Sequence, residues 1–269
     1  MNALPRSWLF TPGSRPDRFA KAAASVADAL ILDLEDAVAE DRKAQARSHV
    51  LEFLTAGPAI RQAVAVRINP LSRAFGLEDL AAIARLPTGP DYVLVPKAEE
   101  PAELALAARV LQDAGSPARL VALVESARGI ARAAELAERT PRLALLMFGA
   151  ADYAADLGRQ VGAFQPDFAR AALVNAAAAG GVAAMDSPFF AIDRPDELAA
   201  ECHKSRALGF DAKAAIHPAQ LEAIGAAFSP TAAERELARR ILDAAPDGVG
   251  VLDGKMIDVA MVRWARRIA

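Results

Sequence analysis

The sequence predicts a closed barrel of eight parallel strands, each followed by a helix, with a helical extension after it. Short apolar runs alternate with helical segments eight times within about 226 residues, which is typical of a parallel sheet. Parallel strands are joined by right-handed crossovers, and eight such units close naturally into a (β/α)8 TIM barrel. The competing architecture is an open, doubly wound sheet. No Gly-x-Gly-x-x-Gly turn follows the first strand, so a dinucleotide-binding sheet is disfavoured.

Each predicted strand is an apolar run that ends at a residue unsuited to a buried strand. Pro12 and Gly13 stop the first strand, and Pro70 closes the third. Proline and glycine are the strongest local signals for such ends. The predicted strands are residues 6–11, 29–32, 64–68, 92–95, 120–124, 143–147, 182–185 and 212–216.

The predicted helices lie between these strands. Pro101 stands where a helix favours proline, near its start, and Gly180 ends a later helix. The barrel helices are residues 16–25, 43–54, 77–84, 101–112, 127–138, 167–179, 195–207 and 218–226. Two more helices, 231–244 and 256–268, are joined by a glycine-bearing link at 247–254. We therefore expect a barrel over residues 1–228 and a helical extension over 229–269, packed on the barrel or on a neighbouring subunit.

The composition excludes several classes of protein. A chain of 269 residues that is 54% hydrophobic suits one large α/β domain. The net charge of −3 shows no basic excess, so binding to nucleic acid or to an anionic membrane is not indicated. No apolar run reaches transmembrane length, and the first residues lack a signal-peptide core. The single cysteine, Cys202, excludes an internal disulfide and fits a reducing cytoplasm.

Charged residues gather where the predicted strands end, and these ends share one face of a barrel. They are Asp33, Glu35, Asp36, Arg67, Lys97, Glu125 and Asp152. Converging carboxylates repel one another unless a cation binds, and Mg²⁺ typically takes one or two carboxylates with substrate oxygens and waters. The three histidines lack zinc-ligand spacing, so a hard, oxygen-bound ion is favoured. Glu125 and Asp152 on adjacent strands therefore predict a metal site.

Simpler interpretations compete with this one. A strand-end acid such as Glu125 or Asp152, taken alone, often caps the following helix. Arg67 in a buried strand needs a partner, and a structural salt bridge to a nearby carboxylate would supply it. His217 after the eighth strand fits a structural histidine better than a catalyst, and Asp258 in the last helix would normally be a surface residue.

Five basic residues form a second group of candidates. They could bind phosphates, or they could simply belong to solvated helix faces; two of them share one helix face at i, i+4 spacing. The five are Arg15, Arg18, Lys21, Lys43 and Arg47.

Eight motifs spread over nearly the whole chain point to a family. They are RSWLFTPGSRPDRF from Arg6, LDLEDAV from Leu32, VRIN from Val66, VPKAE from Val95, LVESARG from Leu123, FGAADYAADLG from Phe148, GFDAKAAIHP from Gly209 and GKMID from Gly254. Together they resemble the motifs of citrate lyase β-subunit-like proteins of the HpcH/HpaI aldolase superfamily. The resemblance implies a (β/α)8 barrel with a C-terminal helical extension, assembled as a homotrimer or a hexamer.

The resemblance also implies Mg²⁺-dependent cleavage or formation of a carbon–carbon bond in an acyl-CoA thioester. Carried over by motif, Glu125 and Asp152 would ligate Mg²⁺, and Arg67 would contact the reacting thioester. Asp36 would hold metal-bound water. Asp258 would be the acid/base, offered into a neighbouring subunit's site.

Further residues follow from the same resemblance. The residues implied near the substrate and the CoA phosphates are Arg15, Arg18, Lys21, Lys43, Arg47, Arg67 and Glu125. One departure is visible, because the family often has an acidic residue before the metal-binding aspartate and this chain has Ala151. The change alters the local charge and leaves the metal ligand in place.

We therefore expect a lyase that cleaves a 3-hydroxyacyl-CoA of the citramalyl-CoA or malyl-CoA type into acetyl-CoA and a 2-oxo acid through an enolate. Three alternatives stay open. The chain could be a citrate lyase β subunit that acts on a citryl-acyl-carrier thioester within a complex. It could catalyse a malate-synthase-like condensation with thioester hydrolysis, or it could be a binding barrel without activity. The sequence does not identify the 2-oxo acid.

Overall fold

The computed structural model of the chain describes residues 4–57 and 60–269. These residues form two compact units, Met1–Phe228 and Ser229–Ala269. The first unit contains the barrel and the candidate site, and the second is a small helical unit that is described separately below.

Eight parallel strands close into a ring in the first unit, as predicted. Each strand pairs with the next along the chain, and β1 pairs with β8. The strands are β1 Ser7–Pro12, β2 Ala29–Asp33, β3 Ala63–Arg67, β4 Tyr92–Val95, β5 Arg119–Val124, β6 Leu143–Phe148, β7 Ala183–Asp186 and β8 Ala212–Ala215. The (β/α)8 barrel fold is therefore confirmed.

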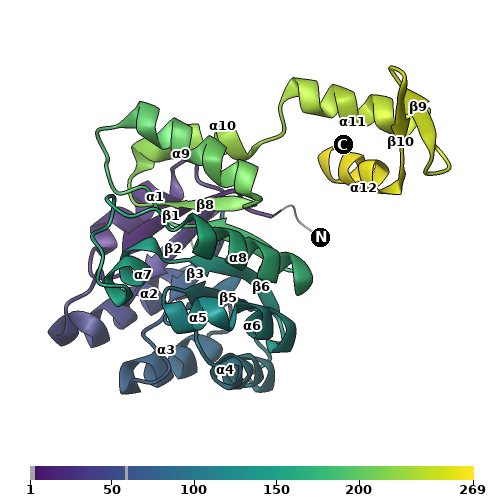
Figure 1. Ribbon diagram of the computed structural model, residues 1–269. Coiled ribbons are helices and arrows are strands. Elements are labelled where there is room, and N and C mark those ends of the chain that lie inside the picture. Colours follow the sequence, from purple (N-terminus) through teal and green to yellow (C-terminus); the bar gives the residue numbers. More distant parts are fainter. Residues whose placement is uncertain (1–3, 58–59) are drawn as a thin grey trace. The chain divides into compact units, whose positions relative to one another are not determined.

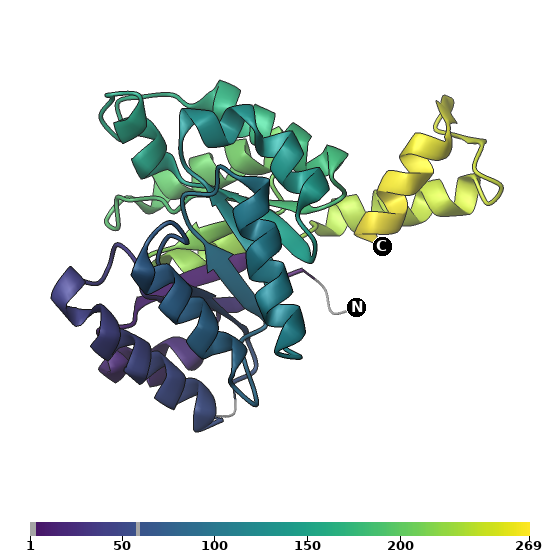
Figure 2. The same cartoon turned by 90° about the horizontal axis from the view of Figure 1, so that it is seen from below.

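The helices of this unit lie outside the ring of strands, as both views of the ribbon show (Figures 1 and 2). They are η1 Pro16–Arg18, α1 Phe19–Ala23, η2 Glu40–Arg42, α2 Lys43–Thr55, α3 Ala74–Ala84, α4 Pro101–Asp113, α5 Ala127–Ala131, α6 Ala133–Arg139, α7 Ala150–Asp156, α8 Asp167–Ala179, α9 Pro195–Leu208, η3 Pro218–Gln220 and α10 Leu221–Phe228. None of the helices in the described parts of the chain is long and apolar enough to cross a membrane.

The apolar core has two layers because every strand is buried on both faces. Inward-pointing residues such as Ile31, Leu94 and Met185 fill the barrel interior. Alternate residues such as Leu32 and Val95 pack outward against the helices. Parallel strands covered on both sides are typically continuous apolar runs, which explains why these strands stood out in the sequence.

The helices of the barrel differ in places from the prediction. The helix expected over 127–138 is divided into α5 and α6 at Arg132, whose backbone leaves the helical conformation. An additional short helix, α7, follows β6 directly. Four of its seven residues are alanines, the strongest helix formers, so a short helix forms immediately after Gly149.

The second unit consists of α11 Ala232–Ala244, a two-stranded hairpin and α12 Val259–Ile268. The prediction of a helix from residue 256 is wrong at its start, because β9 Gly250–Leu252 pairs antiparallel with β10 Lys255–Ile257. The turn between them places Asp253 and Gly254 at positive φ. The helix begins after Asp258, whose carboxylate accepts hydrogen bonds from the backbone N–H groups of Ala260 (2.9 Å) and Met261 (3.1 Å).

Candidate functional site

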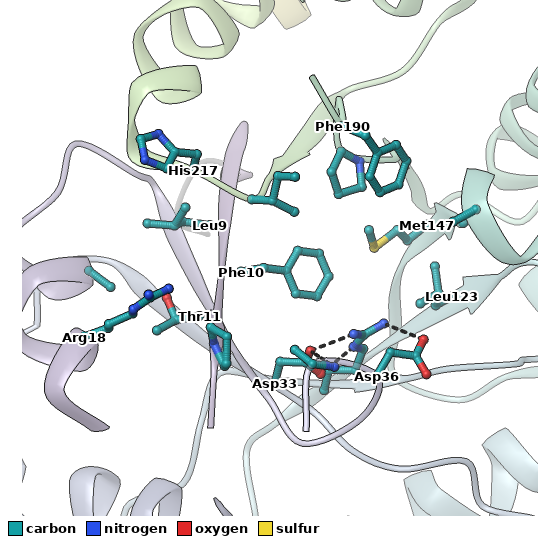
Figure 3. Close-up of a pocket in the computed structure, with 18 of the residues that line it drawn as sticks. Leu9, Phe10, Thr11, Arg18, Asp33, Asp36, Leu123, Met147, Phe190 and His217 are labelled. Carbon is teal, nitrogen blue, oxygen red and sulfur yellow. Dashed lines mark hydrogen bonds and ion pairs between the residues drawn. The ribbon is translucent and has the colours of Figure 1, made fainter. Parts of the chain in front are cut away.

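A cavity of about 910 Å³ opens at the carboxyl ends of the barrel strands. Figure 3 shows the Phe10 ring in the middle of this cavity, with Asp33 and Asp36 below it and Met147 and Phe190 on the other side. One part of the wall is therefore acidic and the other apolar. This is the face on which barrel enzymes place their active sites.

Arg67, at the end of β3, is the fixed positive charge of the cavity. Its Nε and Nη2 donate to the two carboxylate oxygens of Asp33 at 2.6 and 2.7 Å, and its Nη1 lies 2.8 Å from Glu35 Oε2. The guanidinium lies over the Phe10 ring, 5.0 Å from its centroid. Burial alone would lower the pKa of Arg67, but the neighbouring carboxylates raise it above its ordinary value. Arg67 therefore stays charged and cannot rotate freely.

Asp33 holds both Arg67 and its own loop. The backbone N–H groups of Glu35 and Ala37 donate to its carboxylate at 2.9 and 3.3 Å. The salt bridge anticipated for Arg67 thus exists, and it orients the guanidinium that lines the cavity.

Lys97, just after β4, lies among three acids, each of which follows a different strand. Its ammonium nitrogen is 3.2 Å from Glu35 Oε1, 3.8 Å from Glu125 Oε1 and 3.1 Å from Asp152 Oδ1. Its backbone N–H also donates to Glu125 Oε1 at 2.8 Å. The structure therefore brings Glu125 and Asp152 close together. Lys97 lies between this pair and the acids that follow β2.

Neither acid caps its own helix. The N-cap of α5 is Ser126, whose hydroxyl accepts from the Gly129 backbone, and the N-cap of α7 is Gly149. The capping interpretation of Glu125 and Asp152 is therefore wrong, and their position beside Lys97 needs another explanation.

We call the charged groups at this end of the barrel the mouth cluster. It consists of Asp33, Glu35, Asp36, Arg67, Lys97, Glu125 and Asp152. Five carboxyl groups meet two cations here, so negative charge is in excess. A divalent cation would correct this imbalance.

The buried acids of the mouth cluster are incompletely stabilised as anions. Burial raises the pKa of Glu125 to about 8, and the negative charges of Glu35 and Asp152 add to the shift against the opposing effect of Lys97. Burial likewise raises the pKa of Glu35 to about 7, against the effect of Arg67. Both carboxylate oxygens of Glu35 are buried without a well-directed hydrogen bond. Such shifts in a cavity are typical of functional sites.

Gly149 makes room for Glu125. A Cβ atom at this position would lie 2.5 Å from Glu125 Cβ and 2.7 Å from its Oε2. A side chain at position 149 would therefore displace the carboxylate.

Comparison with known proteins now identifies the family. Residues 6–218 match the HpcH/HpaI aldolase/citrate lyase family. The chain belongs to this family. The matched residues contain every strand of the barrel and the whole mouth cluster.

Three relatives are informative. A (3S)-malyl-CoA thioesterase from Cereibacter sphaeroides is 38% identical over 97% of this chain and 92% of its own length. An L-malyl-CoA/β-methylmalyl-CoA lyase from the same organism is 34% identical, covering 98% of this chain and 93% of its own. The crystal structure of the protein CitE from Mycobacterium tuberculosis in complex with magnesium, acetoacetate and coenzyme A is 35% identical, with a TM-score of 0.80, covering 100% of this chain and 98% of that one.

Within the HpcH/HpaI framework, the basic residues of the first β–α turn separate into two kinds. Arg18 and Lys21 line the cavity. Arg15 instead pairs with Asp17, through contacts of 2.9 and 2.7 Å, at an exposed position.

The two basic residues on α2 make internal contacts. The Lys43 ammonium donates to the carbonyl oxygens of Leu34 and Glu35 at 3.1 and 2.9 Å, so it fixes the loop after β2. Arg47 donates to the buried Asp79 at 2.6 Å and contacts Glu78 at 2.7 Å. These contacts give both residues structural roles, and neither lines the described cavity.

The remaining candidates occupy different places. Asp36 lines the cavity, and its half-exposed carboxylate lies 3.9 Å from Arg67. Asp258 belongs to the second unit, where it caps α12.

The sequence predicts that Lys97 lies at the strand ends but indicates no role for it, and Phe10 is not among the predicted site residues. Phe10 lies within the predicted first strand, two residues before Pro12. Because side chains alternate between the two faces of a strand, an inward aromatic side chain could have been predicted here.

Proposed function

We propose that the chain is a Mg²⁺-dependent carbon–carbon lyase that cleaves a 3-hydroxyacyl-CoA of the citramalyl-CoA or malyl-CoA type. The products would be acetyl-CoA and a 2-oxo acid. The observation that carries the proposal is the excess of carboxylates around Lys97 beside the fixed charge of Arg67. The similarity to a malyl-CoA/β-methylmalyl-CoA lyase supports it.

Glu125 and Asp152 fit a magnesium ion. The CitE structure, in complex with magnesium, acetoacetate and coenzyme A, supports the same cofactor here. Among residues 4–57 and 60–269, no group of three or more His, Cys, Asp or Glu side chains forms a ready-made metal site. Mg²⁺ commonly takes one or two carboxylates and completes its shell with substrate oxygens and waters. When bound, it would polarise the oxygens of the 2-oxo acid fragment as a Lewis acid.

Arg67 supplies charge where the reaction creates it. Cleavage leaves the electron pair of the broken carbon–carbon bond on the acetyl-CoA fragment, and its thioester oxygen becomes negative. A guanidinium that is already held by Asp33 and packed on Phe10 needs no reorganisation to face that oxygen. Preorganised charge of this kind is usually the largest single contribution to catalysis.

The remaining roles follow the family resemblance. Arg18 and Lys21, at the cavity, would contact the CoA phosphates, and Asp36 would hold water near the metal. Asp258 would transfer the proton as an acid/base from a neighbouring copy in a homotrimer or hexamer. A carboxylate in that role is effective when its surroundings bring its pKa near the working pH.

The second candidate function is hydrolysis of a malyl-CoA thioester, which the similarity to a (3S)-malyl-CoA thioesterase favours. The two functions differ in their products. A lyase releases acetyl-CoA and a 2-oxo acid, whereas a thioesterase releases free CoA and an intact hydroxy acid.

A panel of 3-hydroxyacyl-CoA thioesters, assayed with Mg²⁺ and with a chelator, tests the proposal. We expect Mg²⁺-dependent release of acetyl-CoA, and a loss on the order of 100-fold or more in Asp152→Ala. Asp113→Ala removes an exposed carboxylate of α4 and is the matched control, with wild-type rates expected. Full activity in Asp152→Ala would contradict the metal assignment. Free CoA without acetyl-CoA would favour the thioesterase.

A further inference from the structure

Lys97 is a charged residue of the mouth cluster for which neither the motifs nor the proposed reaction supplies a role. We propose that Lys97 is a built-in counter-cation, which holds the metal-binding carboxylates together when no metal is bound and competes with the divalent cation for them. The inference rests on the proposed function in one respect, since it takes Mg²⁺ as the competing ion.

The Lys97 ammonium lies where the proposed metal ion would bind. The Lys97 ammonium contacts Glu125 Oε1 at 3.8 Å and Asp152 Oδ1 at 3.1 Å, which belong to the two proposed metal ligands. A cation bound by both carboxylates would lie close to these same oxygens. Two cations confined to so small a space repel each other strongly, because the partly buried site screens them poorly. Lys97 and Mg²⁺ therefore exclude one another from this position.

The Lys97 side chain has room to move while its backbone is anchored. Lys97 has a φ of 51°, in the left-handed region that residues with a side chain rarely adopt. In this conformation its backbone N–H is bonded to Glu125 at 2.8 Å, while its side chain remains 43% exposed. The backbone stays anchored to a ligand as the flexible four-carbon stem moves. The ammonium can thus turn toward solvent without disturbing Glu125.

Lys97 also balances the charge of the site when no metal is bound. Glu35 and Glu125 are 2% and 4% exposed, and Arg67 is already engaged by both oxygens of Asp33. Without the Lys97 ammonium, the carboxyl groups of Glu125 and Asp152 would have no cation in contact among the ion pairs of the described residues. Lys97 therefore keeps the empty site assembled and raises the Mg²⁺ concentration needed to fill it.

Titration calorimetry with MgCl₂ tests the inference directly on the full chain. Lys97→Met removes the competing charge, and we expect its Kd for Mg²⁺ to fall by roughly 10-fold or more relative to wild type. Lys97→Asn is the second variant, because asparagine tolerates a positive φ and also lacks the charge. Lys204→Met is the matched control. It breaks a lysine–aspartate pair with Asp167 (2.9 Å) outside the mouth cluster, so its Kd should equal that of wild type.

Thermal unfolding in EDTA and in saturating MgCl₂ gives a second readout. The increase in Tm on adding Mg²⁺ should be larger in both Lys97 variants than in wild type, since their metal-free state lacks a counter-cation and their affinity is higher. Lys204→Met should show the wild-type increase.

The outcomes separate the two proposals. Tighter Mg²⁺ binding in both Lys97 variants supports the competition, even where wild type binds too weakly to measure. Unchanged or weaker binding in these variants overturns it and leaves the metal site itself standing. If wild type and both Lys97 variants all fail to bind Mg²⁺, the proposed function and this inference fall together.

Discussion

The barrel unit buries charge in several places, and two of these clusters, the mouth cluster and a second one, behave differently. The outer cluster lies between strands β7 and β8 and helices α8 and α9, and consists of Arg170, Asp186, Glu201, Ser205 and Lys213. All three donors of the Lys213 ammonium have a partner: Asp186 at 3.0 Å, Glu201 at 2.6 Å and the Ser187 carbonyl at 2.7 Å. Two cations therefore face two acids in a closed hydrogen-bond network.

The pKa shifts of the two clusters point in opposite directions. Burial alone would raise the pKa of Asp186, but Lys213 and Arg170 hold it below its ordinary value. In the mouth cluster, burial raises the pKa of Glu125 to about 8 in spite of Lys97. Burying charge thus does not by itself mark a functional site. A cluster whose acids remain poorly stabilised can gain from a bound cation, whereas a cluster whose acids already face enough cations gains little.

Removing a cation from the outer cluster should have the largest effect. Lys213→Met leaves Asp186 and Glu201 without the buried charge that neutralises them. Breaking a buried ion pair in this way costs about 3–5 kcal/mol in the free energy of unfolding. Urea denaturation at neutral pH measures this loss. Lys204→Met, which breaks a half-exposed pair, should lose no more than about 1 kcal/mol. Equal losses in the two variants would contradict the closed-network interpretation.

Neutralising one acid in each cluster should change stability in opposite directions. Asp186→Asn leaves Lys213 and Arg170 poorly compensated, and we expect a loss of about 2–3 kcal/mol. Glu125→Gln keeps an oxygen for the Lys97 backbone N–H and removes a carboxyl group whose anion is disfavoured. In EDTA at alkaline pH it should be neutral or stabilise the protein by about 1 kcal/mol.

The same urea experiment, repeated with MgCl₂, provides the control for Glu125→Gln. Wild type should gain stability on adding Mg²⁺, whereas the variant should gain little, because it lacks one proposed ligand. A destabilising effect of both acid variants in EDTA would remove the distinction between the two clusters.

The architecture of the barrel was predictable because its strands are buried on both faces. Runs such as Leu143–Phe148 have no polar interruption, and the charged residues at their ends necessarily share one face. Arg67, Glu125 and Asp152 could therefore be placed near one another from sequence alone. Their geometry agrees with that placement, while their catalytic and metal-binding roles stay proposals.

What the sequence did not predict depends on partners far apart along the chain. The outer cluster pairs Lys213 of β8 with Asp186 of β7 and Arg170 of α8, and nothing local marks these three as partners. Lys97 meets its acidic partners only in the folded barrel, where the acids that follow β2, β5 and β6 lie beside it. The hairpin strand Lys255–Ile257 looked helical because a segment of three residues is too short to show a strand period.

The pH dependence of stability gives the last and smallest test, and it concerns the metal-free protein. Glu35 and Glu125 have pKa values of about 7 and about 8, above the 4.5 of an unperturbed glutamate. At a pH between the ordinary value and the raised values, Glu35 and Glu125 are protonated in the native state but ionised in the unfolded chain. The free energy of unfolding in EDTA should therefore fall as pH rises through this window, by at most about 1.4 kcal/mol per pH unit for each proton.

Asp186 acts in the other direction and at another pH. Its lowered pKa means that its contribution is complete above about pH 4 and is lost only under more acidic conditions, so it does not obscure the window of the two glutamates. Urea titrations at about pH 5.5, 6.5 and 7.5 should show the decline in wild type and a shallower decline in Glu125→Gln. A flat profile in wild type would mean that Glu35 and Glu125 are already ionised and stabilised, as Asp186 is. The acids of the mouth cluster would then be as well neutralised as those of the outer cluster.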